Sequence, residues 1–382
     1  MAAPPPPAPK HRVFLIPGFF GFANLGELRY FGHVRDLLPE LLRARGLAAD
    51  VHVVKTWPTW SLRRRAGLLL DTLAAVAAGD DAPIHLVGHS SGGLDARLLT
   101  TPDIQLPSTH ALAPYVDRIK TVVTVSTPHH GTPVANFFTT LLGQQLLKTL
   151  SLATMYVLRF GQLPISVVLK LAGALAWVGA AAGFGRTTID HLFDQLLGDF
   201  GPERRDAIER FFADVSSDQS LIPQLTPEGI DVLNAAAHDR PGVRYGSVVS
   251  RARRPGPATV WAAGASGYAQ ATHALHLALY RLASRTPRDR APVPSDAQSA
   301  ALRRAYGDLP DARANDSIVP TLSQVWGEVV HATWADHLDV VGHFDDPASE
   351  PPHFDWLATG TGFDRAHFVR LWTDVAAFIS PG

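Results

Sequence analysis

The stretch Gly88-His89-Ser90-Ser91-Gly92 constrains the fold most, because it joins an apolar run at residues 84–87 to a helical pattern at residues 94–99. A serine flanked by glycines at such a strand-to-helix turn takes a strained conformation that pushes its hydroxyl clear of a sheet. The first amides of the helix would face negative charge on an attacked carbonyl. With 31 glycines in the chain, the five letters alone could arise by chance. Together with the flanking strand and helix, they predict that Ser90 is a nucleophile.

Short β-branched runs alternate with helical patterns along the chain, which is typical of a mostly parallel sheet covered by helices. The predicted strands are residues 13–16, 51–54, 84–87, 119–126 and 243–249, and the predicted helices include 34–45, 62–78 and 365–378. Strands that are apolar on both faces are expected where helices cover both sides of a sheet. A chain of 382 residues suits one large α/β domain with a sizeable insertion.

The predicted organisation has four parts. Residues 1–10 are a proline-rich tail that we expect to be disordered. Residues 11–135 and 241–382 form the two halves of the α/β core, and residues 136–240 form a helical lid or cap inserted between them.

The first part of this insertion, from residue 136 to about residue 201, is unusually apolar and has three interpretations. A transmembrane helix needs about 20 apolar residues, but Lys170 and Pro164 interrupt this run. A buried cap helix is the second interpretation. We favour the third, a lid that hides the serine in water and opens on an oily surface.

The composition excludes several classes of site. Lysine and arginine number 34 against 35 acidic residues, so the charge favours neither nucleic acid nor an anionic surface as the main partner. The absence of cysteine excludes disulfides, thiolate metal sites and a cysteine nucleophile. The N-terminus has no charged region followed by an apolar core, so we expect no secretory signal and favour a cytoplasmic protein, with secretion by another route left open.

A serine nucleophile needs a histidine base and a carboxylate that orients it. In a fold with this type of turn, the three residues follow in the order serine, acid, histidine. Among 17 histidines, His337 stands out because it lies shortly before the last predicted helix, and Asp316 is the best carboxylate upstream of it. His343 is the rival base. Asp336 is the rival acid, although a residue adjacent to the histidine can seldom reach its ring.

Several motifs in this order resemble those of the bacterial calcium-dependent triacylglycerol lipases, the true-lipase branch of the α/β hydrolases. The similar segments are residues 86–94, 126–133, 315–320 and 336–339. The similarity spans roughly residues 12–343. Within the insertion, the likeness is one of apolar, helical composition rather than of individual residues. The resemblance implies an α/β-hydrolase fold and hydrolysis of carboxylic esters of lipids through Ser90, His337 and Asp316, without an organic cofactor.

The resemblance also implies an oxyanion hole formed by the backbone amides of Phe19 and Ser91. One residue departs from the family pattern: Pro17 stands before Gly18 where the family has a histidine. Pro17 removes whatever support that histidine gives the loop. The alternative interpretation of residues 17–21 is an ordinary glycine-rich turn at a strand end.

A structural calcium ion is a further implication of the resemblance. The family places a carboxylate two residues after the histidine, which is Asp339 here, and Asp345 is the natural second ligand. Calcium takes about six to eight oxygen ligands, and such an ion would clamp the loop that carries His337. The alternative is a solvated acidic loop.

Five phenylalanines are candidates for an acyl pocket, and the alternative for each is ordinary core: Phe19, Phe20, Phe22, Phe137 and Phe138. An apolar pocket favours a lipid or another apolar ester as substrate. The same scaffold could also serve an intracellular esterase, a polyester depolymerase or an acyltransferase. A lipid-binding protein without activity is the alternative from another class.

Overall fold

The computed structural model describes residues 10–19, 30–160, 163–176, 186–350, 352–353, 355 and 357–380. Phe20, Phe22, most of the proline-rich tail and residues 177–185 of the predicted lid lie outside the described residues.

The described residues form a six-stranded sheet with the order β2-β1-β3-β4-β5-β6, and every neighbouring pair is parallel. The strands are β1 (His11–Ile16), β2 (Ala49–Val53), β3 (Ile84–His89), β4 (Ile119–Val125), β5 (Arg244–Arg251) and β6 (Glu328–Trp334). The predicted mostly parallel α/β fold is confirmed. Sequence reasoning missed β6, because this edge strand is only partly buried and its polar residues break up the apolar run.

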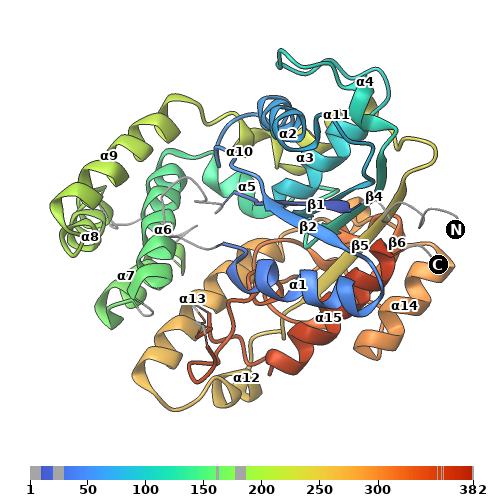
Figure 1. The fold of residues 1–382 in the computed structure, drawn as a ribbon. Coiled ribbons are helices and arrows are strands. Elements are labelled where there is room, and N and C mark those ends of the chain that lie inside the picture. The colour runs from blue at the N-terminus through green and yellow to red at the C-terminus, as the bar shows by residue number, and fades with distance from the viewer. Residues whose placement is uncertain are drawn as a thin grey trace, which may run out of the picture.

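Helices cover both faces of the sheet, and β1 shows how the sequence divides them. Val13 and Leu15 belong to the core cluster under α1 (Gly32–Ala44) and α15 (Arg365–Ile379). Phe14 and Ile16 belong to the cluster under α2 (Leu62–Ala77) and α3 (Ser91–Thr100). Successive side chains of a strand point to opposite faces, so this run of apolar residues fills both cores. Figure 1 shows α1 and α15 on one side of the sheet and α2 and α3 on the other.

The connection from β4 to β5 is helical in its described part. Its helices are α5 (Pro133–Phe138), α6 (Leu141–Phe160), α7 (Ile165–Ala176), α8 (Arg186–Gly198), α9 (Pro202–Ser217), α10 (Leu221–Gln224) and α11 (Pro227–Ala236). Helices α6 to α9 form a layer at one end of the molecule (Figure 1). Among the described residues, no helix combines the length and the apolarity that crossing a bilayer requires.

The connection between β5 and β6 is also long, from residue 252 to residue 327. The other helices are α4 (Ala113–Val116), α12 (Pro257–Ala262), α13 (Gly267–Ala283) and α14 (Asp296–Tyr306), with 3₁₀ turns at Arg288–Arg290, Thr321–Gln324 and Asp339–Val341. Helix α13 packs against α7, so the β5–β6 connection supports the helical layer. Because all strands are parallel, the loops after β1, β3, β5 and β6 meet at the carboxyl-terminal end of the sheet, where ligands bind in open α/β folds.

Candidate active site

Ser90 sits on the sharp turn between β3 and α3. Its φ of +54° lies in the left-handed region, which costs a residue with a side chain on the order of 1–3 kcal/mol. The flanking glycines make the turn possible. A Cβ on Gly88 would lie 2.4 Å from the backbone of Gly92, and a Cβ on Gly92 would lie 2.2 Å from the Ile16 carbonyl oxygen. The Ser90 amide donates to the Val125 carbonyl at 2.8 Å, which ties the turn to β4.

His337 and Asp316 lie together, although 21 residues separate them in the chain. The His337 Nδ1 atom is 2.8 Å from Asp316 Oδ2, and the His337 amide donates to the Asp316 carbonyl oxygen at 3.0 Å. Both side chains are buried. Nδ1 faces a carboxylate, so it carries a proton. The other ring nitrogen, Nε2, is therefore the basic one in the neutral ring.

The rival residues make other contacts. Asp336 Oδ1 accepts from the amides of Leu338 and Asp339 at 2.8 and 2.9 Å, so it caps its own turn and does not orient His337. His343 Nε2 donates to the Tyr30 carbonyl oxygen at 3.3 Å, and burial lowers the pKa of His343 to about 4. Asp336 therefore holds the backbone of its own turn, and His343 holds the backbone of Tyr30.

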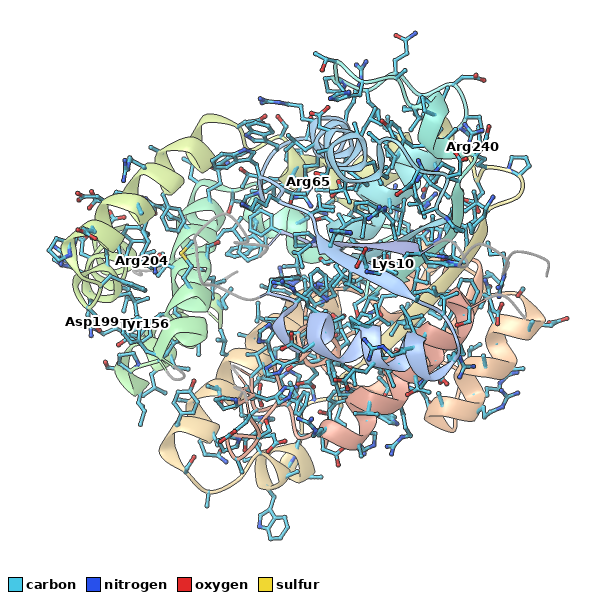
Figure 2. The ribbon with its side chains drawn as sticks, viewed as in Figure 1. Lys10, Arg65, Tyr156, Asp199, Arg204 and Arg240 are labelled. Carbon is cyan, nitrogen blue, oxygen red and sulfur yellow. The ribbon has the colours of Figure 1, made fainter. Side chains whose placement is uncertain are left out.

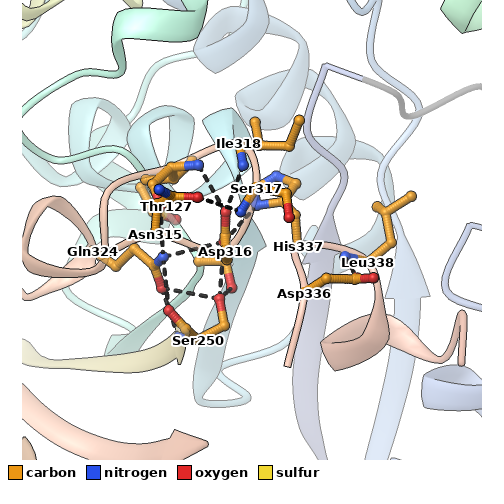
Figure 3. A network of polar contacts seen from close by, with 12 residues as sticks. Thr127, Ser250, Asn315, Asp316, Ser317, Ile318, Gln324, Asp336, His337 and Leu338 are labelled. Atoms are coloured by element: carbon orange, nitrogen blue, oxygen red, sulfur yellow. Dashed lines mark hydrogen bonds and ion pairs between the residues drawn. The ribbon is translucent and has the colours of Figure 1, made fainter. Parts of the chain in front are cut away.

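The Asp316 carboxylate is held by several donors besides His337 (Figure 3). Oδ1 accepts from the amides of Ile318 and Val319 at 3.0 and 2.7 Å. Oδ2 accepts from Ser250 Oγ at 2.9 Å and from Gln324 Nε2 at 3.1 Å. A buried charge is costly unless hydrogen bonds replace its hydration. These donors compensate for burial of the carboxylate and fix its direction.

Sequence reasoning did not identify Ser250 and Gln324. Gln324 is held in turn by the Ser250 backbone: its Oε1 accepts from the Ser250 amide at 2.7 Å, and its Nε2 donates to the Ser250 carbonyl at 3.1 Å. The available signal was weak, because Ser250 directly follows the predicted strand at residues 243–249 and Gln324 belongs to no motif.

The segment after β1 passes very close to Ser90. A Cβ on Gly18 would lie 2.5 Å from Ser90 Cβ and 3.1 Å from Ser90 Oγ, so only glycine fits there. Phe19 lines the same pocket as Ser90, and Ser91 is the first residue of α3. The structure therefore places both residues predicted for the oxyanion hole near Ser90.

An ion pair that was not predicted anchors this segment. Arg65 of α2 and Asp95 of α3 are fully buried, with Arg65 Nη2 2.7 Å from Asp95 Oδ2 (Figure 2 labels Arg65). The same Nη2 donates to the Pro17 carbonyl oxygen at 2.8 Å, and Nη1 donates to the Trp57 carbonyl oxygen at 2.8 Å. A charged donor therefore reaches the carbonyl oxygen of Pro17. Pro17 is the residue that stands where the lipases that the sequence resembles have a histidine.

An apolar pocket opens beside Ser90. Helix α6 contributes Leu147 and Leu150 to its wall, so the helical layer covers the serine, whose exposed fraction is 8%. Phe19 and Phe138 line the pocket, whereas Phe137 is part of the hydrophobic core. The remaining lining residues are Pro128, Thr132, Val134, Ala135, Ile222, Leu225, Leu279, Ile318 and Val319. Thr132 is the one polar side chain besides Ser90 in this lining.

A group of carboxylates lies just beyond His337. One carboxylate oxygen from each of Asp336, Asp339 and Asp355 falls within 4.8 Å of the others. Burial is the largest cause of a raised pKa at Asp336 and at Asp339, and their mutual repulsion raises the pKa of Asp339 further. Asp336 Oδ2 is buried and has no hydrogen-bond partner among the described residues. Asp345 lies on the wall of the cavity that Asp339 and Asp355 also line, outside the group of three.

Comparison with known proteins adds the fold relationship. No family model matches the sequence, and no curated protein matches it either. Among solved structures, the Staphylococcus hyicus lipase is similar, with 14% identity over 99% of this chain and 98% of that chain and a TM-score of 0.52. Lipase 1 from Pelosinus fermentans is similar at 16% identity over 98% and 99% of the two chains, with a TM-score of 0.51. EstA from Clostridium botulinum is similar at 19% identity over 97% and 87%, with a TM-score of 0.50. The chain therefore shares the α/β-hydrolase fold of these two lipases and of EstA.

Proposed function

We propose that the protein is a serine hydrolase that cleaves carboxylic esters of lipids. The observation that carries the proposal is the buried pair of His337 and Asp316, with Nδ1 2.8 Å from Oδ2. The pair lies at the carboxyl-terminal end of the sheet, where Ser90 occupies its strained turn. The fold shared with two lipases supports it, and so does the apolar lining of the pocket beside Ser90.

In the proposed reaction, Ser90 Oγ attacks the ester carbonyl carbon while His337 Nε2 takes the hydroxyl proton. Asp316 stabilises the imidazolium through Nδ1, and the amides of Phe19 and Ser91 donate to the oxyanion. The C–O bond then breaks, and the leaving alcohol takes the proton from His337. Water then attacks the acyl carbonyl carbon while His337 takes its proton. The bond to Ser90 Oγ breaks, His337 returns the proton to Oγ, and the acid is released.

The helical layer gives the proposal its second part, a lid that meets a lipid surface. Helix α6 exposes Leu141 and α7 exposes Ile165 and Leu169, while Leu147 and Leu150 of α6 face the pocket. Apolar side chains that are exposed on such helices lose contact with water when the helices lie in a lipid interface. The same displacement of α6 would open the pocket above Ser90.

The test is covalent labelling with a p-nitrophenyl phosphonate, followed by peptide mapping, together with turnover of p-nitrophenyl esters. We expect the label on Ser90, and we expect Ser90→Ala to be folded and inactive. Ser299→Ala, a serine on α14, is the control and should keep wild-type activity. Label on another residue, or turnover by Ser90→Ala, would overturn the proposal. Lipid uptake that is unaffected by Ser90→Ala, without turnover by the wild type, would identify a binding protein instead.

Substrate profiling separates the ester hydrolases that share this chemistry. A lipase is expected to turn over emulsified triacylglycerols, whereas a polyester depolymerase would release soluble acids from a polyester film. An acyltransferase would transfer the acyl group to an added alcohol faster than to water. We expect hydrolysis of glycerides to dominate, because the pocket lining is apolar and water is the acceptor in the proposed reaction.

We also propose that Ca²⁺ binds at Asp336, Asp339 and Asp355. Oxygen donors suit this hard cation, and the buried, unpartnered Asp336 Oδ2 supports a ligand at this position. Asp345, on the same cavity wall, is available as an outer contact. When bound, the ion would neutralise the group and clamp the loop that carries His337.

Thermal melting tests the calcium proposal. EDTA should lower the melting temperature, and added Ca²⁺ should restore it. Asp355→Asn should blunt both effects, while Asp308→Asn, at an exposed carboxylate that pairs with Arg251, should leave them intact. Equal melting temperatures with EDTA and with Ca²⁺ would contradict the proposal that the protein binds calcium.

A further inference from the structure

Two buried side chains lie between the segment after β1 and the loop that carries His337, and the reaction proposed above does not use them. Tyr30 precedes α1 and has an exposed fraction of 4%, and His89 is the last residue of β3 and is fully buried. The Tyr30 hydroxyl is hydrogen-bonded to His89 Nδ1. His89 Nε2 lies 2.8 Å from the carbonyl oxygen of His337.

Elementary hydrogen-bond chemistry assigns the protons in this contact. A carbonyl oxygen only accepts, so His89 Nε2 must donate to His337. Burial lowers the pKa of His89 well below its usual value, so the ring is neutral and its Nδ1 is an acceptor. The Tyr30 hydroxyl therefore donates to Nδ1, and its oxygen remains free to accept. It accepts from the backbone amide of Gly18.

The result is a directed chain of hydrogen bonds across three loops. It runs from the Gly18 amide to the Tyr30 hydroxyl, from that hydroxyl to His89 Nδ1, and from His89 Nε2 to the His337 carbonyl. Gly18 precedes Phe19 and nearly touches Ser90, and His89 is the residue before Ser90. The chain thus connects the segment after β1, the serine turn and the histidine loop.

The backbone of His337 is held on both sides. Its amide donates to the Asp316 carbonyl oxygen at 3.0 Å, and its carbonyl accepts from His89. The His89 and His337 rings also pack at a centroid distance of 4.7 Å. Because both backbone groups are bonded, rotation of the His337 peptide would break at least one of these hydrogen bonds.

We propose that Tyr30 and His89 are positioning residues, which hold His337 and the Gly18–Phe19 peptide in register with Ser90 through this chain of hydrogen bonds. The inference rests on the function proposed above, because it assigns a role in that reaction. A displacement of about 1 Å at a reacting group can cost on the order of 10²-fold in rate. Loss of the chain should therefore slow acyl transfer without weakening substrate binding.

The first test removes one hydroxyl. Tyr30→Phe keeps the aromatic ring, which packs edge-on against Phe31 at 4.9 Å. We expect kcat for a p-nitrophenyl ester and the rate of phosphonate labelling of Ser90 to fall about 10-fold, which corresponds to the loss of one hydrogen bond of ordinary net strength. KM should stay within about twofold, because the hydroxyl does not line the apolar pocket.

Tyr245→Phe is the matched control. The Tyr245 hydroxyl likewise accepts from a backbone amide, that of Arg240, and donates to a side chain, that of Thr100. It lies near the start of β5, at the amino-terminal end of the sheet, whereas Ser90 lies at the carboxyl-terminal end. We expect a change in melting temperature of similar size in both variants, but a loss of kcat in Tyr30→Phe alone.

Rescue at position 89 distinguishes positioning from packing. His89→Gln can still present an amide N–H to the His337 carbonyl, whereas His89→Leu fills similar space without a donor. We expect kcat of His89→Gln to exceed that of His89→Leu by about 10-fold. Equal kcat in these two variants, or wild-type kcat and labelling in Tyr30→Phe, would overturn the inference, and the Tyr30 result decides alone if His89→Leu does not fold.

The outcomes also separate this inference from the proposed function. Wild-type enzyme that labels at Ser90, together with an unimpaired Tyr30→Phe variant, rejects the positioning role and leaves the hydrolase intact. Wild-type enzyme that does not label at Ser90 and turns over no ester rejects both.

Discussion

The imidazole of His337 and the carboxylate of Asp316 meet at 2.8 Å in the interior, and the backbone of His337 bonds to the backbone of the same aspartate. This double contact holds the ring of His337 with Nδ1 toward the carboxylate and leaves Nε2 as the proton acceptor. Four other donors reach the Asp316 carboxylate, so its direction does not depend on His337.

Asp316→Asn should abolish most activity without unfolding the protein. The asparagine keeps the size of the side chain, but its amide nitrogen would donate where the carboxylate accepted, which favours the wrong tautomer of His337. We expect kcat to fall about 10³- to 10⁴-fold. Ester turnover and thermal melting of the same preparation check this, and activity within 10-fold of wild type would contradict the assigned role of Asp316.

Gly18→Ala should impair catalysis through a steric clash. The added Cβ would lie 2.5 Å from Ser90 Cβ, so either the segment after β1 or the serine turn must shift. We expect a loss of kcat of about 10²-fold, because displaced groups no longer meet the reacting carbonyl.

Gly201→Ala is the control for this substitution, because its Cβ would meet no atom within 4 Å and its φ is negative. Steady-state kinetics on both variants are the measurement. Normal kinetics in Gly18→Ala would mean that the segment does not approach Ser90 as closely as described.

Arg65→Met should destabilise the protein strongly, and a second substitution should restore much of the loss. The single change leaves Asp95 buried without its cation and removes the donor to the Pro17 carbonyl. Breaking a buried pair in this way costs about 3–5 kcal/mol. Urea unfolding should show that loss in Arg65→Met and a smaller one in the double variant Arg65→Met/Asp95→Leu.

The kinetics of the double variant then report on the Pro17 carbonyl. We expect its kcat to stay reduced although stability recovers, since no donor reaches that carbonyl. Full recovery of kcat would show that Arg65 acts through stability alone.

His85 should make the protein less stable in acid. Burial in β3 lowers the pKa of His85 to about 3, so between this value and the ordinary value of 6.5 the unfolded chain binds a proton that the folded chain does not. The contribution of His85 to the free energy of unfolding is complete above pH 6.5. It decreases as the pH falls below 6.5, by up to about 3 kcal/mol at pH 4.5.

Comparison of unfolding free energies at pH 7 and pH 4.5 tests this direction. His85→Gln should show a smaller decrease than the wild type. His110→Gln, at an exposed histidine, should behave as the wild type does. An identical decrease in the wild type and His85→Gln would assign the acid sensitivity to other groups.

Local structure was predictable wherever a few adjacent residues decide it. The apolar runs predicted β1 to β5 to within a few residues, because each of these strands contains a short group of apolar, mostly β-branched residues. The glycines beside Ser90 predicted the turn, because side chains at Gly88 and Gly92 would overlap neighbouring backbone. Chain order then singled out Asp316 and His337 before any distance was known.

The partners of these residues were not predictable from sequence. Ser250, Gln324, Arg65 and Tyr30 belong to no motif, and each meets its partner from another part of the chain. The grouping of Asp336 and Asp339 with Asp355 was equally hidden, and β6 was missed because polar residues interrupt its apolar run.

The sequence by itself determined the class of fold, the serine turn and the candidates for its acid and base, because backbone sterics and strand burial act over a few neighbouring residues. Only the tertiary structure decided what surrounds them: the donors on Asp316, the Arg65 contact to Pro17, the hydrogen bonds from Gly18 to His337 and the helical layer over Ser90. Apart from the donors within eight residues of Asp316, those contacts join residues more than ten positions apart. Hydrogen bonds of that kind depend on distances and directions that exist only once the chain has packed.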